Sequence, residues 1–311
     1  MSTRVTFIMN PAANRGDALR LKEPLTSQVE KTASKGDFVL SWAYTTRPQH
    51  AADLARDAAE AGEDIVVAVG GDGTVHEVVN GLMQANTSKR PSLGIIPVGS
   101  GNDFAFNMGL PSKAPEAVRV IFTGKPRTID VGMIADTNGR VESWNNSCGV
   151  GFSGTVNYWS RNITILRGFI LYFVAVLRTI IFQPPNVNVE MNADENEVVK
   201  ERITMLSVCN GPREGGGFPV SPNAVMDDGL LTYTVMGDMN RFQILRFLPV
   251  VMAANHLKHP RFFRDGTATR YRVKADAPLD IHIDGEIFAQ ISQNISEVEF
   301  TVVPGALQVI S

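Results

Sequence analysis

A glycine-rich segment with one carboxylate is the part of this sequence best suited to chemistry. It reads Gly70-Gly71-Asp72-Gly73-Thr74 and follows the apolar run 64–69. Glycine permits positive φ and a close approach of the backbone to a ligand, and a helix starting here would direct free N–H groups at a phosphate. The carboxylate can hold Mg²⁺ or accept a proton from a hydroxyl. A tight turn with a capped helix fits the segment as well, so both interpretations stay open at this point.

Two further polar loops follow strand-like runs. One is Asn10-Pro11-Ala12-Ala13-Asn14-Arg15-Gly16, after residues 4–9. The other is Pro97-Val98-Gly99-Ser100-Gly101-Asn102-Asp103-Phe104-Ala105, after residues 92–96. In open α/β sheets, ligands bind at the carboxyl ends of the strands. If these strands lie in one parallel sheet, the three loops converge on one edge, and a nucleotide site explains that convergence.

The elements that must position these loops alternate along the first part of the chain. Short apolar runs separate amphipathic segments in the order βαβαβαβ, which predicts a parallel sheet in a three-layer α/β domain with helices on both faces. The run 64–69, which is continuously apolar after Asp64, is typical of a parallel strand that is buried on both sides. The predicted strands are 4–9, 38–44, 64–69 and 92–96, and the predicted helices are 17–35, 48–61 and 75–84.

The pattern changes near residues 125–130, where short alternating runs separated by Gly, Pro, Asn and Asp begin. This pattern predicts an antiparallel sandwich or barrel, interrupted by helices at 168–181 and 242–257. We therefore expect an α/β domain over residues 1–128, with a C-terminal return segment of about 298–311, and an all-β sandwich-like domain over 129–297.

Composition excludes several classes of protein. Hydrophobic residues make up 44% of the chain, charged residues 20%, and the net charge is -3. These values indicate a globular protein and argue against a nucleic-acid binder, which is usually basic. Cys148 and Cys209 lie in apolar runs and form no metal-binding spacing, so we expect two buried free thiols rather than a disulfide or a zinc site.

The sequence leaves the mode of membrane contact open. The N-terminus has too short an apolar run for a signal peptide. The most apolar stretch, Gly168 to Leu177 between Arg167 and Arg178, is shorter than the roughly 20 residues that a spanning helix needs. It is either a core helix or a helix that lines an apolar pocket or rests on a bilayer. The second half also gathers basic residues, which form a solvated face or contact anionic headgroups: Arg213, Arg241, Arg246, Lys258, Arg261, Arg264, Arg270 and Arg272.

Two well-known phosphate-binding signatures do not apply. The segment Gly149 to Gly154 matches G-x-G-x-x-G, but no acidic residue follows near position 170, as a dinucleotide fold requires. We interpret it as a cluster of β-turn glycines. No Walker A sequence is present, so a phosphate site in this chain does not use that lysine.

The loops together resemble the diacylglycerol kinase catalytic domain family, which includes sphingosine and ceramide kinases and soluble bacterial relatives. The matching patterns are N-P-x-x-x-x-G at 10–16, G-G-D-G-T at 70–74 and P-x-G-[TS]-x-N-D-F-A at 97–105. Further matches are Gly215-Gly216-Gly217, the segment from Pro222 through Asp227-Asp228-Gly229-Leu230, and Ile283-Asp284-Gly285-Glu286. They run through nearly the whole chain in the family's order.

The resemblance implies an α/β nucleotide domain, a C-terminal β-sandwich and an active-site cleft between them. It makes Asp72 the essential acidic residue and Glu286 a candidate general base, and it leaves open which of the two takes the proton. ATP and Mg²⁺ are the implied cofactors. The implied nucleotide-binding residues are Asn10, Pro11, Asn14, Arg15, Gly16, Thr45, Gly70, Gly71, Gly73, Thr74, Ser100, Asn102 and Asp103.

Resemblance to the soluble bacterial members also implies a second, structural Mg²⁺. It would be held by the Asp228 side chain and by the backbones of Val225 and Leu230. Ser100 stands where Thr is commoner but keeps the hydroxyl. Two positions depart from the family pattern. Arg15 stands where small residues or Gly are usual, so it either contacts phosphate or faces solvent, and Ser221 stands where the family often has Ala before Pro.

We therefore expect an ATP- and Mg²⁺-dependent lipid kinase that phosphorylates the hydroxyl of diacylglycerol or a related lipid alcohol in phospholipid metabolism. It is expected to be cytoplasmic and peripheral to the inner face of the membrane, with transient membrane contact, and a homodimer is left open. One alternative is an NAD kinase-like enzyme with a soluble acceptor, because NAD kinases share G-G-D-G-T. The other is a non-catalytic nucleotide- or lipid-binding regulator, against which the presence of Asp72 and Glu286 argues.

Overall fold

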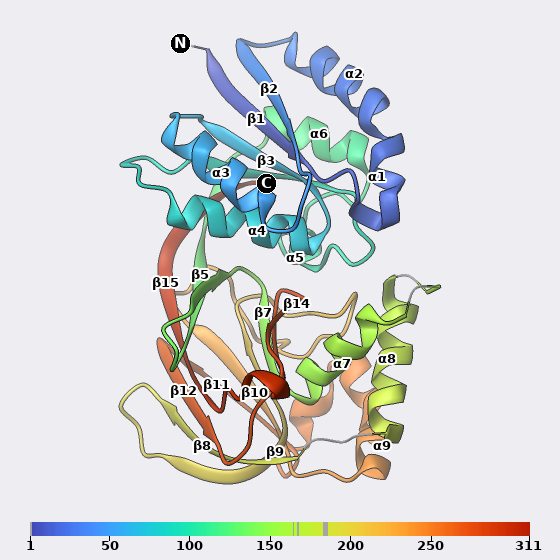
Figure 1. Cartoon of the computed structure of the whole chain (residues 1–311), viewed down its shortest axis with the longest axis vertical. Coiled ribbons are helices and arrows are strands. Elements are labelled where there is room, and N and C mark those ends of the chain that lie inside the picture. Colours follow the sequence, from blue (N-terminus) through green and yellow to red (C-terminus); the bar gives the residue numbers. More distant parts are fainter. Residues whose placement is uncertain (1, 164, 167, 183–185) are drawn as a thin grey trace. The chain divides into compact units, whose positions relative to one another are not determined.

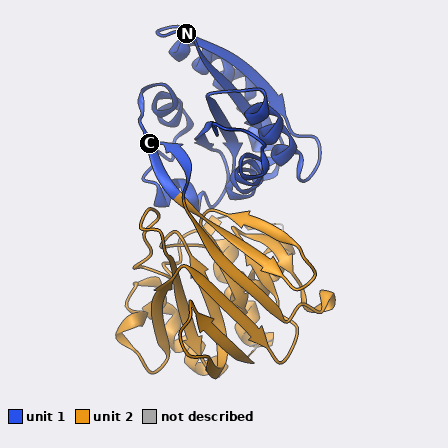
Figure 2. Cartoon of the chain, turned by 90° about the vertical axis from the view of Figure 1, so that its left-hand side faces the viewer, with its two compact units in different colours: residues 1–129, 305–311 blue, residues 130–304 orange. Residues whose placement is uncertain are grey.

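The computed structural model describes residues 2–163, 165–166, 168–182 and 186–311, and the chain divides into two compact units (Figure 1 and Figure 2). Unit 1 comprises residues 1–129 and 305–311, and unit 2 comprises residues 130–304. The chain passes from one unit to the other within β5 (Pro126–Asp136) and returns within β15 (Glu297–Ile310). An α/β unit followed by a β-rich unit confirms the predicted fold class.

Unit 1 is built on a parallel sheet. Its strands run in the order β2 (Phe38–Tyr44), β1 (Thr3–Met9), β3 (Ile65–Gly70) and β4 (Ser92–Pro97), and the end of β15 lies parallel to β4. Every residue of β3 is buried, as expected for a parallel strand that is covered on both faces. The carboxyl ends of β1, β3 and β4 therefore lie side by side at one edge of the sheet.

The helices of unit 1 pack in two groups. In one group α2 (Lys22–Ala33) packs with α6 (Ala114–Thr123), and in the other α3 (His50–Glu60) packs with α4 (Asp72–Gln84). The predicted single helix 17–35 is wrong, because α1 (Asp17–Arg20) ends before α2 begins. Pro24 in the first turn of α2 explains the break, since its ring would clash with the carbonyl four residues earlier in a continuous helix. Sequence patterns did not predict α6 or the short α5 (Asp103–Asn107).

Unit 2 is dominated by antiparallel strands around a core that contains Trp144, Phe288 and Phe300. Strand β10 (Leu231–Gly237) pairs with both β9 (Val199–Cys209) and β11 (Phe263–Ala268), and β6 (Val141–Trp144) pairs with β5. The main path runs through β14 (Glu286–Ala289), β13 (Ile281–Ile283), β7 (Ser147–Gly151), β9 (Val199–Cys209), β8 (Val187–Ala193), β12 (Arg270–Ala275) and β15.

Three helices of unit 2 share a separate apolar cluster: α7 (Phe152–Arg161), α8 (Gly168–Phe182) and α9 (Arg241–Met252). The prediction that Gly149 to Gly154 forms a β-turn is wrong, because β7 continues into α7 at this point. Gly151 makes the junction with a φ of 76°, a conformation that favours glycine. None of the helices in the described ranges is long and apolar enough to cross a membrane.

The prediction for the cysteines is confirmed. Cys148 and Cys209 are both free and buried. Burial disfavours the thiolate and raises the pKa of each thiol well above its usual value. Both cysteines therefore act as small core residues.

Candidate active site

The three predicted loops of unit 1 are tied to one another at the edge of the sheet. The amide nitrogen Nδ2 of Asn10 donates to Oγ1 of Thr74 at 3.1 Å. The other end of the same amide, Oδ1, accepts the N–H of Ala12 at 3.0 Å. Asn10 thus joins the loop after β1 to the first turn of α4, and its side chain has a positioning role in addition to any contact with a ligand.

Two glycines bring the loops after β3 and β4 into backbone contact. A Cβ added at Gly99 would lie 2.3 Å from Cα of Gly71 and 2.7 Å from Oδ1 of Asn102. The Asn102 amide fixes this loop by accepting the N–H of Gly99 at 3.0 Å and donating to its carbonyl at 2.9 Å. The two loops therefore present bare backbone at their contact, which suits the close approach of a phosphate chain.

Asp72 lies at the centre of this arrangement. It is the first residue of α4, which begins three residues before the predicted start at Val75 and so includes Gly73 and Thr74 in its first turn. Oδ1 of Asp72 accepts the N–H of Phe104 at 3.2 Å, which links it to the N-terminus of α5. Helix N-termini stabilise anions. The Asp72 carboxylate and a bound phosphate would both lie near these positive N-terminal helix ends. A cation between the two negative groups would relieve their repulsion.

The remaining predicted nucleotide-binding residues lie on the same loops. Thr45 directly follows β2, and its N–H donates to the carbonyl of Met9 at 2.9 Å. Ser100 is exposed, whereas Asp103 is buried at the start of α5. In the first loop Pro11 is partly buried, and left-handed backbone occurs at Asn14, Arg15 and Gly16, with φ values of 50°, 58° and 87°.

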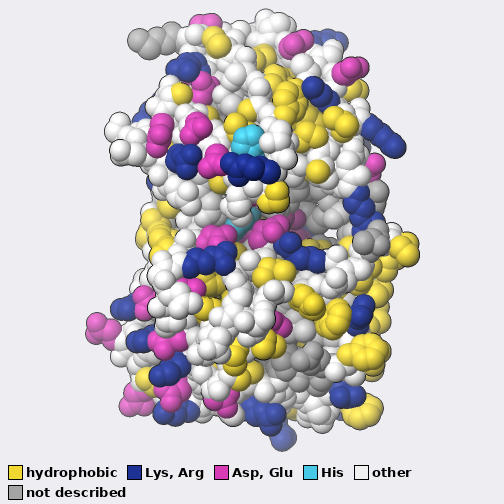
Figure 3. All heavy atoms as spheres, in the orientation of Figure 1, with side chains coloured by type: hydrophobic (Ala, Val, Ile, Leu, Met, Phe, Trp, Pro, Cys, Tyr) yellow, Lys and Arg dark blue, Asp and Glu magenta, His cyan; other side chains and the backbone are white. Residues whose placement is uncertain are grey.

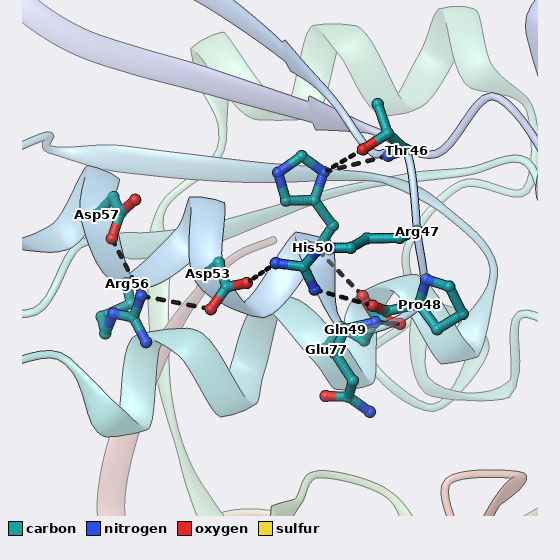
Figure 4. Close-up of polar contacts among 10 residues, drawn as sticks. Thr46, Arg47, Pro48, Gln49, His50, Asp53, Arg56, Asp57 and Glu77 are labelled. Carbon is teal, nitrogen blue, oxygen red and sulfur yellow. Dashed lines mark hydrogen bonds and ion pairs between the residues drawn. The ribbon is translucent and has the colours of Figure 1, made fainter.

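Figure 4 shows a second set of contacts, on the loop that follows Thr45. The N–H of Thr46 donates to Nδ1 of His50 at 3.1 Å. The Glu77 carboxylate, on α4, accepts the N–H of Gln49 at 2.9 Å and the N–H of Ala51 at 3.0 Å. Glu77 thus caps the N-terminus of α3 and holds the loop after β2 against the helix that begins with Asp72. Sequence reasoning missed it, because a single acidic residue within an apolar helix carries no motif.

The same loop carries a charged pair. Arg47 contacts Asp53 of α3 at 2.5 Å, and this hydrogen bond lowers the pKa of the Asp53 carboxyl. Both side chains are more than a third exposed, so the pair contributes little to stability. Its effect is to hold the Arg47 side chain over the start of α3 (Figure 4).

In unit 2, Glu286 is the first residue of β14, directly after the tight turn of the β13–β14 hairpin. Its Oε2 forms an ion pair with Arg161, the last residue of α7, at 2.6 Å. The Arg161 guanidinium also donates to the carbonyl of Gly285 at 3.1 Å, and Nδ2 of Asn157 donates to the same carbonyl at 2.8 Å. The end of α7 therefore fixes the hairpin and the direction of the Glu286 side chain, which stays 40% exposed. The sequence did not point to Arg161.

A buried carboxylate in the turn of this hairpin stabilises it. Asp284, with a φ of 50°, accepts the N–H groups of Asn145, Asn146 and Ser147 at 3.0, 2.9 and 3.1 Å. Such charge-assisted bonds from backbone N–H groups are stronger than neutral ones. Asp284 therefore anchors the turn on which Glu286 is carried.

A further buried polar group lies on β13. Nε2 of His282 is 2.6 Å from Oγ of Ser153 and 3.9 Å from a carboxylate oxygen of Glu214. All three side chains are buried, and desolvation lowers the pKa of His282. The group connects α7, β13 and the glycine-rich loop 214–217, and none of its members was predicted as functional.

The predicted metal-binding residues Val225, Asp228 and Leu230 share one turn of unit 2. Oδ1 of Asp228 accepts the N–H of Leu230 at 3.0 Å, and buried Asp130 accepts the N–H of Gly229 at 2.7 Å. One carboxylate and two peptide carbonyls are hard oxygen donors of the kind that Mg²⁺ and Ca²⁺ prefer. Within the described ranges no cluster of three His, Cys, Asp or Glu residues offers a metal cage.

Comparisons with known proteins find similar domains for both parts of the chain. Residues 4–134 match the diacylglycerol kinase catalytic domain, and residues 146–311 match the YegS C-terminal NAD kinase beta sandwich-like domain. A diacylglycerol kinase of Mycobacterium tuberculosis is 30% identical over 312 residues, which cover 99% of this chain and 94% of the relative. A diacylglycerol kinase of Bacillus subtilis is 27% identical over 286 residues, which cover 91% of this chain and 89% of the relative.

The fold also matches a solved structure. The crystal structure of a diacylglycerol kinase from Bacillus anthracis str. Sterne aligns with a TM-score of 0.72 and 21% sequence identity, over 99% of this chain and 96% of that one. At this level of identity the match bears on the fold alone. Both units of this chain therefore have counterparts in a protein of the same two-domain architecture.

Proposed function

Because the chain belongs to the diacylglycerol kinase family, whose members are lipid kinases, we propose that it transfers the γ-phosphoryl group of ATP to a hydroxyl of diacylglycerol or a closely related lipid alcohol. Membership in a kinase family implies the use of ATP. The proposed reaction would serve phospholipid metabolism, since it turns a neutral lipid into an anionic one.

One observation supports this proposal most directly. The loops after β1, β3 and β4 are joined through Asn10 to Thr74, Gly71 to Gly99 and Asp72 to Phe104. This places bare glycine backbone and the N-terminus of α4 around a single carboxylate. Phosphoryl transfer depends mainly on positioning and charge stabilisation, and this arrangement supplies both for a triphosphate.

The two carboxylates receive different roles in the proposal. Asp72 is the oxygen ligand for a Mg²⁺ that, when bound, would neutralise charge on the phosphate oxygens. Glu286 accepts the proton of the attacking hydroxyl, because its carboxylate is partly exposed and Arg161 sets its direction. A second Mg²⁺ in the turn around Asp228 would stabilise unit 2 rather than take part in the transfer.

The test is transfer of labelled phosphate from ATP, with Mg²⁺, to a panel of diacylglycerol, sphingosine, ceramide and NAD. We expect labelled lipid, and we expect Asp72→Asn to abolish most transfer while the thermal unfolding temperature stays near that of the wild type. Labelled NAD in place of labelled lipid, or intact ATP binding without transfer to any acceptor, would overturn the proposal.

Separate variants test the two roles. Glu286→Gln is expected to lower the rate of transfer and to leave ATP affinity unchanged, whereas Asp72→Asn is expected to lower the Mg²⁺ dependence of ATP binding. Unchanged transfer by Asp72→Asn would show that this carboxylate is idle and would favour a nucleotide-binding regulator. Equal effects of both variants on Mg²⁺-dependent ATP binding would refute the division of roles.

A further inference from the structure

The outer face of α8 is apolar. Its exposed positions follow one helical stripe, in which Ile170 is 60%, Val174 36% and Ile181 57% exposed. The opposite face packs into the core through Ala175, Val176, Thr179 and Ile180. A surface helix of a globular protein normally turns charged or polar residues outward, so α8 lacks the usual polar face.

Helix α9 repeats this arrangement beside α8. Phe242 is 79%, Leu245 49% and Met252 41% exposed, while Ile244, Phe247 and Leu248 are buried. The two helices pack on each other and share one apolar cluster. In Figure 3 hydrophobic side chains gather along the edge of unit 2 where Figure 1 draws α8. We call the exposed residues of α8 and α9 the outer helical face.

The two segments that carry this face are basic, and Asp238 and Asp265 border the second of them. Residues 152–182 and 239–264 together carry eight Lys and Arg and no Asp or Glu, in a chain whose net charge is -3. Arg178 is exposed on the α8 stripe, with its guanidinium 4.0 Å from the ring centroid of Trp159, and Arg241 and Arg246 are exposed on α9. Of the other basic residues, Arg167 lies outside the described residues, Arg161 pairs with Glu286, and Arg264 pairs with Glu201.

We propose that the outer helical face docks on the surface of a bilayer that contains anionic phospholipids. The acyl boundary of such a bilayer would take the exposed Ile, Val, Phe and Leu side chains, and its headgroups would take the arginines, as in other interfacial helices. A second copy of this chain is a poorer partner, because two faces of the same positive charge would repel. The inference deepens the proposed function, since a lipid acceptor lies in a membrane.

Vesicle flotation tests the proposal without any reaction. The wild-type chain is mixed with phosphatidylcholine vesicles, with or without phosphatidylglycerol, and compared with Ile170→Ser/Phe242→Ser and Arg178→Gln/Arg241→Gln. We expect the wild type to prefer anionic vesicles, and raised salt to weaken that preference. The apolar pair is expected to weaken binding about tenfold or more, and the arginine pair about 25-fold on anionic vesicles, at roughly fivefold for each charge.

Control variants change other exposed residues, away from the outer helical face. Val141→Ser/Val198→Ser removes valines that are 51% and 53% exposed, and Lys35→Gln/Arg119→Gln removes two exposed charges from unit 1. Both are expected to bind vesicles like the wild type. Binding by the outer-face variants that equals the wild type, or equal losses in the controls, would overturn the proposal.

Two more measurements separate this proposal from its alternatives. If light scattering shows that Ile170→Ser/Phe242→Ser turns a dimer into a monomer with unchanged vesicle binding, the face joins copies of the chain and the proposal is wrong. Transfer to a short-chain diacylglycerol below its micelle concentration should be unaffected by the outer-face variants. Vesicle binding without transfer to any lipid would contradict the kinase proposal and leave the docking proposal standing. Transfer to a lipid by a chain that does not bind vesicles would contradict the docking proposal and leave the kinase proposal standing.

Discussion

The contact between Gly71 and Gly99 gives a direct test of how the active site is built. A methyl group at position 99 would lie 2.3 Å from Cα of Gly71 and 2.7 Å from Oδ1 of Asn102, whereas carbon atoms in contact are about 3.5–4.0 Å apart. The loops in Gly99→Ala must therefore separate by roughly 1 Å or more. Overpacking of this kind costs about 1–3 kcal/mol, so we expect the free energy of unfolding to fall by that amount.

Separation of the loops should also weaken nucleotide binding. The backbone N–H groups that would face the phosphates of a bound nucleotide would move apart, and the loss of one hydrogen bond to a charged group costs about 1.5–3 kcal/mol. We therefore expect the Kd for ATP to rise about tenfold or more, measured by isothermal titration calorimetry. Urea denaturation gives the stability of the same samples.

Alanine substitutions at two other glycines serve as comparisons for the effect of Gly99→Ala. A Cβ at Gly71 would lie 3.0 Å from Cα of Gly99, so Gly71→Ala should be the milder of the two changes in the site. A Cβ at Gly237 in unit 2 would meet its nearest atom at 3.6 Å, an ordinary contact, and Gly237→Ala should leave both stability and ATP affinity unchanged. If Gly99→Ala behaves like Gly237→Ala in both assays, the loops do not touch and the reasoning is wrong.

Three further outcomes follow from the contacts around this site and hairpin. Glu77→Gln removes the charge that caps α3 and should cost about 1 kcal/mol of unfolding free energy and weaken ATP binding, whereas the exposed Glu30→Gln should do neither. Gln49→Gly relieves a φ of 64° and should stabilise the chain by about 0.5–1 kcal/mol in urea denaturation; a loss of stability would contradict this. Burial lowers the pKa of His282 below the usual 6.5, so the unfolded state binds more protons below that pH. The His282 contribution should therefore be constant above about pH 6.5 and fall below it, by up to about 1.4 kcal/mol per pH unit, and His282→Gln should flatten this slope in unfolding measurements from pH 5 to 8.

The sequence predicted the sheet of unit 1 well, because continuous apolar runs such as β3 report burial on both faces. It failed at the start of α4. Glycine has a low helix propensity, so the pattern favoured a helix from Val75 onward, whereas the contacts of Asn10 with Thr74 and of Phe104 with Asp72 accompany helical backbone from Asp72. Tertiary contacts override local propensity here.

Sequence patterns did not predict the residues that support the candidate site. Glu77 caps a helix 26 positions away, Asp130 binds a turn 99 positions away, and Arg161 orients a carboxylate 125 positions away. Each is an ordinary charged residue in its own segment, and its role follows only from the fold. Motifs predict residues that would face a ligand, because the chemistry of a ligand constrains such residues locally.

For helix α8, hydrophobic periodicity alone does not predict which face of the helix stays exposed. A helix that is apolar all round has the same pattern in a core and on a bilayer, and only its neighbours show which face stays open. Residues 168–182 bury one side against unit 2 and expose Ile170 and Ile181 on the other. The amino-acid sequence alone shows that residues 152–182 and 239–264 contain no Asp or Glu. A core helix has no reason to exclude acidic residues from the segments around it, whereas an anionic surface does.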